Sequence, residues 1–249
     1  MKSSEERVIV VSGASSGIGQ AAAVAFQRTG AIVHGFASNA GSLAAARDRH
    51  PEIRWRAVDL TKRTEIDAAI KAIVDESGRI DTLVNNAGIY KFAPLEASDD
   101  TLMRSQFEIN VFGLIALTQA ALPALKASQG SIVNVSSTSG HKAMRDQSMY
   151  GATKAAVNSL TRTWALELGA HRVRVNAIAP GPTETEGIAR LPFPKEVFAA
   201  MRAQIEAQLP LGRTASSAEV AHWIVVLADP QATWLTGQVL GVDGGLSVT

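Results

Sequence analysis

The segment from Val8 to Gly19 reads Val8-Ile9-Val10-Val11-Ser12-Gly13-Ala14-Ser15-Ser16-Gly17-Ile18-Gly19, and an alanine-rich stretch follows it through about Thr29. Its β-branched start predicts a buried strand, and the stretch after the glycines predicts a helix. Strand, glycine loop and helix in this order form the setting of a phosphate-binding turn. Glycines let the backbone approach a pyrophosphate, and a helix N-terminus favours negative charge. Tight turns also need glycine, so the loop by itself leaves both interpretations open.

The rest of the chain repeats the alternation of strand and helix. Further strands are expected at about 30–36, 53–58, 81–84, 131–136, 173–178 and 238–242, and helices at about 62–77, 101–122, 148–168 and 216–228. Pro123 should end or bend the second of these helices, because proline lacks an N–H. Short loops and right-handed crossovers then imply a single α/β domain over residues 1–249. Its fold class is doubly wound and Rossmann-like, with a parallel sheet of about seven strands covered by helices on both faces.

Residues 186–212 interrupt this alternation. They carry Pro192, Pro194 and Pro210 around an apolar stretch. An insertion after the carboxyl end of a strand suits a substrate lid. A helical hairpin packed on a partner subunit suits the same composition, and the sequence leaves both open.

Composition excludes several classes of function. Hydrophobic residues make up 46% of the 249 and charged residues 19%, which argues for a globular protein and against disorder. The net charge of +1 gives no reason to expect nucleic acid or an anionic membrane as a partner. Absence of cysteine excludes disulfides and thiolate metal sites, and the five scattered histidines give no metal-ligand spacing. No apolar run approaches the ~18 residues that span a bilayer. The chain is expected to be soluble and cytoplasmic.

The end of the second expected strand bears on the choice of cofactor. NAD sites usually place an acid here, on the ribose 2′-hydroxyl. This chain has Ala37-Ser38-Asn39 and no acid before Asp48, so a 2′-phosphate would not be repelled. Ser38 and Asn39 could donate to it, although plain helix capping explains them equally well. No lysine or arginine stands nearby. The sequence favours NADP and leaves NAD open.

Proton-transfer chemistry is predicted around Tyr150. Ser137 lies thirteen residues before it, at the end of an expected strand, and Lys154 lies four after it, on the same helix face. Lowering the pKa of tyrosine from ~10 to ~7.5 takes about 3.4 kcal/mol. One positive charge about 4 Å away supplies about 4 kcal/mol at an effective dielectric of about 20.

Two further polar features stand near expected strand ends or inside helices. The segment Asn85-Asn86-Ala87-Gly88 follows another strand and suits either the lip of a site or an ordinary turn. Asn110, inside the expected helix at 101–122, either satisfies a local kink or holds a functional water.

Together these pieces resemble the short-chain dehydrogenase/reductase family, from about Val8 to Gly245. The matching positions are Gly13-x-x-x-Gly17-Ile18-Gly19, Asp59, Asn85-Asn86-Ala87-Gly88, Asn110, Ser137, Tyr150-x-x-x-Lys154, Pro180-Gly181 and Thr185. The resemblance implies that Tyr150 is the acid/base, that Lys154 binds the nicotinamide ribose and lowers the phenol pKa, and that Ser137 orients the substrate. It also implies that Asn110 holds a water in a proton relay.

The same resemblance implies the cofactor contacts. Asp59 would bind the adenine edge, Asn86 would line the adenosine ribose, and residues 178–185 would surround the nicotinamide. The predicted set is Gly13, Ser15, Ser16, Gly17, Ile18, Gly19, Ser38, Asn39, Asp59, Leu60, Asn86, Ala87, Gly88, Tyr150, Lys154, Pro180, Gly181, Thr183 and Thr185. A homotetramer is implied too, paired through the helices at 101–122 and 148–168 and through the C-terminal helix and strand.

The expected reaction is hydride transfer between NAD(P)(H) and a small secondary alcohol or ketone. Reduction of a carbon–carbon double bond is a second possibility, but relatives with that chemistry space Tyr and Lys seven apart, where this chain has Val157. A non-catalytic dinucleotide-binding sensor or scaffold is the alternative from another class, because fold does not fix function. The substrate stays open among 3-oxoacyl thioesters, sugars or polyols, and cyclic ketones.

Overall fold

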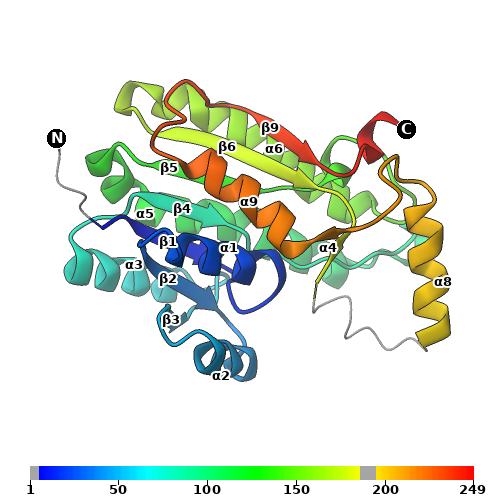
Figure 1. The fold of residues 1–249 in the computed structure, drawn as a ribbon, viewed down its shortest axis with the longest axis horizontal. Helices are drawn as coiled ribbons and strands as arrows, with labels where there is room; N and C mark the ends of the chain where they lie inside the picture. Colours follow the sequence, from blue (N-terminus) through cyan, green and yellow to red (C-terminus); the bar gives the residue numbers. More distant parts are fainter. Residues whose placement is uncertain (1–5, 186–194) are drawn as a thin grey trace.

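A computed structural model describes residues 6–185 and 195–249, and it contains one large parallel sheet (Figure 1). Seven strands run in the order β3-β2-β1-β4-β5-β6-β9. Their bounds are Val8–Ser12 (β1), Ile32–Ala37 (β2), Arg54–Ala57 (β3), Thr82–Asn85 (β4), Ser131–Val135 (β5), Arg174–Pro180 (β6) and Val239–Val242 (β9). The order reverses direction between β1 and β4, which is where doubly wound folds bind ligands. The predicted fold class is confirmed.

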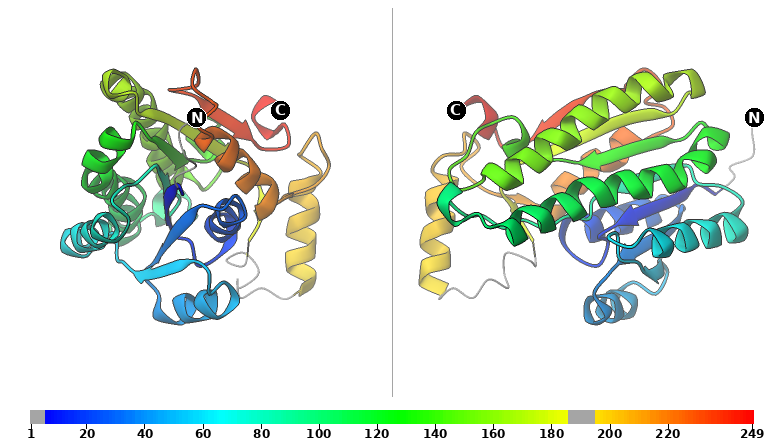
Figure 2. Two further views of the ribbon diagram at one scale, coloured as in Figure 1. Left: turned by 60° about the vertical axis from the view of Figure 1, so that its left-hand side comes forward. Right: turned by 180° about the vertical axis from the view of Figure 1, so that it is seen from behind.

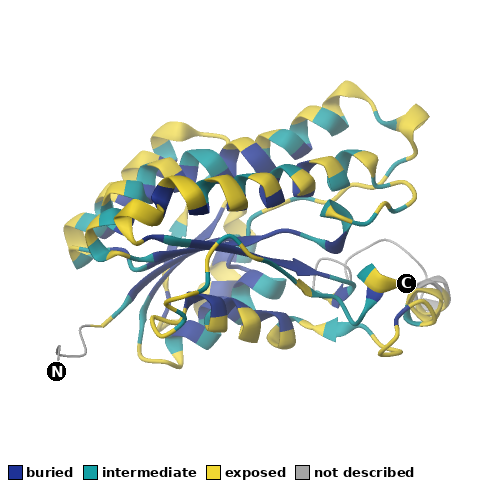
Figure 3. Ribbon diagram, turned by 90° about the horizontal axis from the view of Figure 1, so that it is seen from above, coloured by how far each residue is buried: buried dark blue, intermediate teal, exposed yellow. Residues whose placement is uncertain are grey.

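Helices cover both faces of the sheet (Figures 2 and 3). Their bounds are Gly17–Gln27 (α1), Ala40–Arg49 (α2), Arg63–Ser77 (α3), Asp100–Phe107 (α4), Leu114–Ser128 (α5), Ser148–Leu168 (α6), Lys195–Glu206 (α8) and Ser217–Ala228 (α9). Strand β1 is buried on both sides, and it sends Ile9 and Val11 into a core with α1 and α9. Val8 and Val10 enter a second core with α3 and α5. This is the two-sided burial that the continuous apolar strands predict.

The longest helical stretch differs from the prediction. It runs from Asp100 to Ser128, with a π-helical segment at Glu108–Gly113 between α4 and α5 and with Pro123 inside α5. Pro123 was expected to end or bend the helix, and it does not end it. Proline removes only one helical hydrogen bond, and the fully buried Ala121 and Leu125 on either side of it hold the helix against the core.

The same stretch also corrects a second expectation. By length and composition it is apolar enough to cross a bilayer, contrary to the prediction that no run approaches that length. Its apolar residues serve the domain core instead, since Leu117, Ala121 and Leu125 pack with α3 and the sheet. A core helix of this kind meets the length and composition criteria without a membrane.

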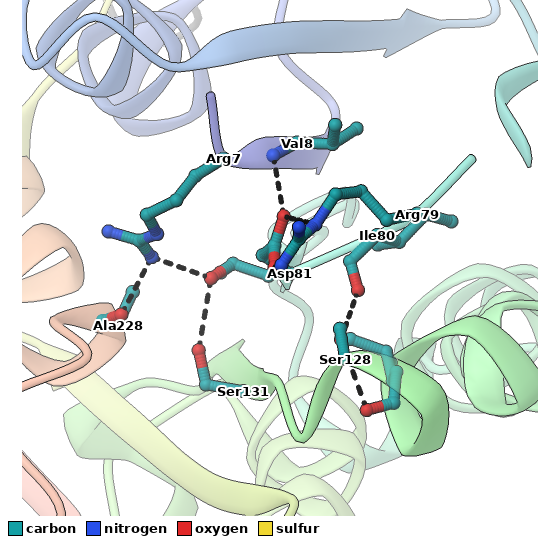
Figure 4. Close-up of polar contacts among 10 residues, drawn as sticks. Arg7, Val8, Arg79, Ile80, Asp81, Ser128, Ser131 and Ala228 are labelled. Carbon is teal, nitrogen blue, oxygen red and sulfur yellow. Dashed lines mark hydrogen bonds and ion pairs between the residues drawn. The ribbon is translucent and has the colours of Figure 1, made fainter. Parts of the chain in front are cut away.

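The amino end of the sheet is closed by polar contacts (Figure 4). Arg7 donates to the carbonyl of Ala228 at the end of α9 (2.8 Å), where a cation also suits the helix dipole. Asp81 accepts from the Val8 N–H (2.8 Å) and pairs with Arg79 (2.7 Å). These bonds hold β1, the start of β4 and the end of α9 together. The opposite, carboxyl edge carries the loops in which the candidate residues lie.

A two-stranded sheet follows β6 and was not predicted. It pairs Thr183–Glu184 (β7) with Ala215–Ser216 (β8), next to the capping box in which Ser216 and Glu219 begin α9. Residues 186–194, which make up the start of the predicted lid, lie outside the described residues. The part that follows forms α8, which stands at the side of the sheet in Figure 1. The lid and the hairpin interpretations both stay predictions.

Candidate active site

The glycine loop after β1 forms a tight cradle that only glycine can build. Gly13 has φ +63° and Gly17 has φ +55°, both in the left-handed region. A Cβ on Gly13 would lie 2.8 Å from the Ala87 Cα, and one on Gly19 would overlap the Gly13 carbonyl oxygen. Ser16, the N-cap of α1, makes no side-chain cap bond, and the first turn holds no acid. The free N–H groups of this turn therefore fit the pyrophosphate of a dinucleotide.

Asn86 supports this cradle from the end of β4. Its side-chain amide donates to the carbonyls of Ser12 (3.0 Å) and Gly13 (3.1 Å). The Ser12 hydroxyl accepts in turn from the backbone N–H groups of Asn86 and Ala87, each at 3.0 Å. The predicted lip is thus a brace between β1 and β4, and both Asn86 amide donors point at the glycine loop.

The end of β2 is polar and free of acid. Asn39 caps α2 by accepting from the Ser42 N–H (2.9 Å), which confirms the capping interpretation of this residue. The Ser15 hydroxyl of the glycine loop donates to the Ser42 hydroxyl (3.2 Å), and Ser38 is exposed beside them. Hydroxyls from two segments therefore meet where a ribose would lie. Ser42 was not predicted from the sequence, because its position in the first turn of α2 signals only helix capping.

Asp59 follows β3 at the same edge. Its carboxylate accepts from the N–H (3.0 Å) and the hydroxyl (2.8 Å) of Thr61, and these bonds hold the pKa of Asp59 below its usual value. The next residue, Leu60, is buried in the core against Gly113, so only its backbone is free to contact a cofactor. Asp59 is thus kept charged and oriented beside the cradle.

Ser137, Tyr150 and Lys154 come together as predicted. The Ser137 side chain, two residues after the end of β5, lies next to the Tyr150 phenol and acts to lower its pKa. Its hydroxyl donates to the Ser139 hydroxyl (3.3 Å). The Lys154 ammonium lies 5.7 Å from the centre of the Tyr150 ring. Its Nζ donates to the Val135 carbonyl at 2.8 Å, within the protein interior. A strand end and one face of α6 therefore present a hydroxyl, a phenol and an ammonium to the same space.

The electrostatics of this group differ from the sequence-based expectation. Burial raises the pKa of Tyr150, although the neighbouring Ser137 side chain acts to lower it. Burial also lowers the pKa of Lys154 from 10.5 to about 8. The expectation of a phenol pKa near 7.5 assumed an ammonium about 4 Å from the phenol. In the structure the ammonium is directed at the Val135 carbonyl, because a buried cation needs a nearby acceptor.

Asn110 connects the site to the long helix. Its side chain accepts from the Ile89 N–H (2.8 Å) and donates to the Ile89 carbonyl (2.9 Å) and the Thr153 hydroxyl (3.1 Å). Thr153 in turn donates to the Tyr150 carbonyl (2.7 Å). Asn110 lies in the π-helical segment Glu108–Gly113. A Cβ on Gly88 would lie 3.1 Å from the Asn110 side-chain oxygen and 3.6 Å from Lys154 Nζ. A side chain at position 88 would therefore crowd Asn110, which explains why glycine is found there.

The segment after β6 closes the other side of the cradle. The Gly181 N–H donates to the Val242 carbonyl (3.0 Å), and a Cβ on Gly181 would lie 2.7 Å from the Asp243 Cα. Thr183 donates to the Gly181 carbonyl (2.9 Å). The Thr185 methyl group would lie 3.2 Å from a Cβ on Gly17. Residues 180–185 therefore return over the glycine loop, as expected of a nicotinamide pocket.

Comparisons with known proteins agree with this geometry. A family model described as "Enoyl-(Acyl carrier protein) reductase" matches residues 13–247. The 3-oxoacyl-[acyl-carrier-protein] reductase FabG of Thermotoga maritima is 38% identical, over 98% of this chain and 99% of its own. The chain belongs to the short-chain dehydrogenase/reductase family. Another relative in that family is the cis-4-hydroxycyclohexanecarboxylate dehydrogenase of Sinomonas cyclohexanicum, 39% identical over 96% of both chains.

A solved structure supports the same assignment. The 3-ketoacyl-(acyl-carrier-protein) reductase of Brucella melitensis, crystallised with NADH, has a TM-score of 0.90 and 30% identity, and the match covers 98% of this chain and 99% of that one. This short-chain dehydrogenase/reductase is therefore an oxidoreductase that uses an NAD(P)-type cofactor on CH–OH and C=O groups. Within residues 6–185 and 195–249, no cluster of three metal-ligating side chains accompanies that site.

Besides Ser42, sequence reasoning missed two further residues of this short-chain dehydrogenase/reductase site. Thr153 links Asn110 to the helix of Tyr150. Gln106 is fully buried one turn before Asn110 and holds the loop after Gly88. A signal for Gln106 was present, since polar side chains four residues apart share a helix face.

Proposed function

We propose that Tyr150 is the general acid and base of a reversible ketone reduction, with Ser137 holding the substrate oxygen. The observation that carries this proposal is the grouping of three side chains: Ser137 lies next to the Tyr150 phenol, and the Lys154 ammonium, one helical turn along, lies 5.7 Å from the centre of the Tyr150 ring. When bound, NAD(P)(H) supplies or accepts the hydride at its nicotinamide ring. Protein side chains transfer the proton and hold the substrate oxygen.

During reduction, negative charge develops on the substrate oxygen, and the Tyr150 hydroxyl donates its proton there. The raised pKa of Tyr150 keeps the phenol protonated at neutral pH, which suits this direction. Ser137 donates a second hydrogen bond to the same oxygen. During oxidation, the positive charge of Lys154 favours the phenolate that must accept the proton. Asn110, through Thr153, fixes the start of α6.

We propose the following test of these roles. Replacing Tyr150 by Phe removes the transferable proton and keeps the ring packing, so turnover should fall at least about 100-fold. Affinity for NAD(P)H, followed by nicotinamide fluorescence, should change less than threefold. Near-normal turnover would contradict the role of Tyr150. A chain that binds the dinucleotide but turns over no alcohol or ketone would instead be the non-catalytic sensor, which no observation on the described residues favours.

We also propose NADP(H) as the preferred cofactor. Support comes from the hydroxyls of Ser15, Ser38 and Ser42 and from the absence of an acid in the first turn of α2. A 2′-phosphate gains hydrogen bonds there and meets no carboxylate. Titration with NADPH and NADH should give at least tenfold tighter binding of NADPH. Equal or tighter binding of NADH would overturn the preference.

Finally, we propose a cytoplasmic homotetramer that acts on small-molecule alcohols and ketones. Exposed apolar side chains support the assembly: Phe112 and Leu166 lie on the long helices, and Trp223 and Val226 lie on α9. Light scattering of the purified chain should give four times the mass of one chain, and a monomer mass would contradict the assembly.

A further inference from the structure

The loop after Gly88 is held in an unusually regular way. Asn110 binds both the N–H and the carbonyl of Ile89. Gln106 does the same for Lys91, accepting from its N–H (3.3 Å) and donating to its carbonyl (3.2 Å). The Ala93 N–H donates to the Asp146 carbonyl at 2.8 Å. Backbone contacts therefore fix alternate residues of this loop.

The side-chain amides of Gln106 and Asn110 fit the loop because their spacing along the helix matches the spacing of the loop residues that they bind. Residues four apart on a helix are about 6 Å apart along its axis. Residues two apart on an extended chain are about 6.6 Å apart. Gln106 and Asn110 thus act toward the loop as the edge of a neighbouring strand would. The result is an extended segment fixed in register against the long helix.

The residues between the fixed positions are aromatic and exposed. Tyr90 is 40% exposed and Phe92 is 53% exposed. Their ring centres lie 6.1 Å apart, and the Phe92 ring meets the Tyr150 ring edge-to-face at 5.6 Å. Three rings therefore form a wall that begins at the proton-transferring phenol. Large rings left exposed on a fixed loop indicate a binding surface.

We propose that this wall selects ketones and alcohols whose reacting carbon lies in or next to an apolar ring, and that Gln106 is the positioning residue that holds the wall against Tyr150. The inference rests on the proposed role of Tyr150. A ring buries a whole face on aromatic side chains, whereas a linear chain of equal carbon number covers less of them and loses rotamer freedom on binding. Because the wall is fixed before binding, ordering it costs the ring substrate little.

The test compares two six-carbon ketones, cyclohexanone and 2-hexanone, with NADPH as the reductant. We expect wild-type kcat/KM to favour cyclohexanone. Phe92→Leu should lower the cyclohexanone-to-hexanone ratio of kcat/KM at least fivefold relative to wild type. Intrinsic reactivity differences between the ketones cancel in that comparison. Leu95→Ala, at an exposed residue just beyond the fixed segment, is the control and should leave the ratio unchanged.

Gln106→Met tests the positioning role, because it keeps the side-chain length and removes both amide contacts. We expect KM for cyclohexanone to rise at least fivefold, while kcat for 2-hexanone and NADPH affinity stay within twofold. A fall in kcat for both ketones together with weaker NADPH binding would show a merely structural role and overturn this part. If Gln106→Met does not fold, Phe92→Leu still decides the wall.

An unchanged ratio in Phe92→Leu would overturn the inference and leave the proposed function intact. Wild-type protein that reduces neither ketone nor any other would instead overturn the proposed function.

Discussion

Replacing Lys154 by Met should stabilise the cofactor-free protein while abolishing turnover. Lys154 is only 5% exposed, and burial lowers its pKa from 10.5 to about 8. That drop corresponds to about 3 kcal/mol of cost for keeping the folded side chain charged at pH 7. Methionine removes the charge but leaves the Val135 carbonyl without its partner, which costs about 1 kcal/mol. The net gain at pH 7 is about 2 kcal/mol, or a Tm increase of about 4–8 °C.

The pH dependence gives this prediction a specific sign. Between pH 8 and 10.5 the unfolded lysine binds more protons than the folded one, so wild-type stability from this residue rises with pH. From pH 7 to pH 9.5 the wild type should gain about 2 kcal/mol that the variant does not gain. The advantage of Lys154→Met should therefore nearly vanish at pH 9.5. Other groups titrate equally in both proteins and cancel in the difference.

Urea unfolding followed by circular dichroism, at both pH values and at one protein concentration, measures this difference. The matched control is Lys71→Met, since Lys71 has a side chain 74% exposed and pairs with Asp75, which is also exposed. It should change stability little at either pH. A destabilised Lys154→Met, or an advantage equal at pH 7 and pH 9.5, would refute the reasoning that Lys154 is a desolvated cation in the cofactor-free fold.

Three further predictions concern other parts of the fold. In the urea unfolding assay, Gly13→Ala should destabilise the protein by at least about 2 kcal/mol, because its Cβ meets the Ala87 backbone, and it should also weaken NAD(P)H binding. The control is Gly30→Ala, at a position with φ +84° and no neighbour within 4 Å, which should cost only about 1 kcal/mol. Ser42→Asp should shift the NADPH-to-NADH affinity ratio at least tenfold toward NADH, measured by fluorescence titration, and an unchanged ratio would remove Ser42 from the ribose site. Burial holds the pKa of His34 at about 4. Between pH 7.5 and 5.0 the wild type should therefore lose about 2 kcal/mol of unfolding free energy that His34→Leu does not lose. Equal losses in the two proteins would contradict a neutral buried imidazole.

The sequence predicted the sheet because its central strands, such as β1, β4 and β5, are short and buried on both faces, which leaves a clear pattern. Placement of the candidate residues at one edge followed from topology alone, since each of these loops comes after a parallel strand. Pro123 shows where local rules fail. Its helix continues because Ala121 and Leu125 are buried in the core, and core contacts of this kind are set by elements distant in sequence.

Side-chain direction was harder to predict than side-chain position. The i, i+4 spacing correctly placed Tyr150 and Lys154 on one face of α6. It could not show that the ammonium is directed at the Val135 carbonyl, because β5 supplies that acceptor from nineteen residues away. The sequence-based pKa argument counted the attraction between charge and phenol and omitted the cost of burying both. In the structure that cost is larger, and it raises the pKa of Tyr150.

Buried polar groups without partners do not by themselves locate the active site. Asn158 on α6 keeps a buried side-chain oxygen with no partner among the described residues, one turn beyond the buried Lys154. His34 likewise has two buried ring nitrogens without a partner among the described residues. It lies in the middle of β2, however, and the residues that pair with it on β1 and β3 are not candidate site residues. What distinguishes Lys154 is convergence. A hydroxyl from the loop after β5, a phenol one turn earlier on α6 and Gly88 from the loop after β4 reach the same space, so the cost of its burial there has a chemical use.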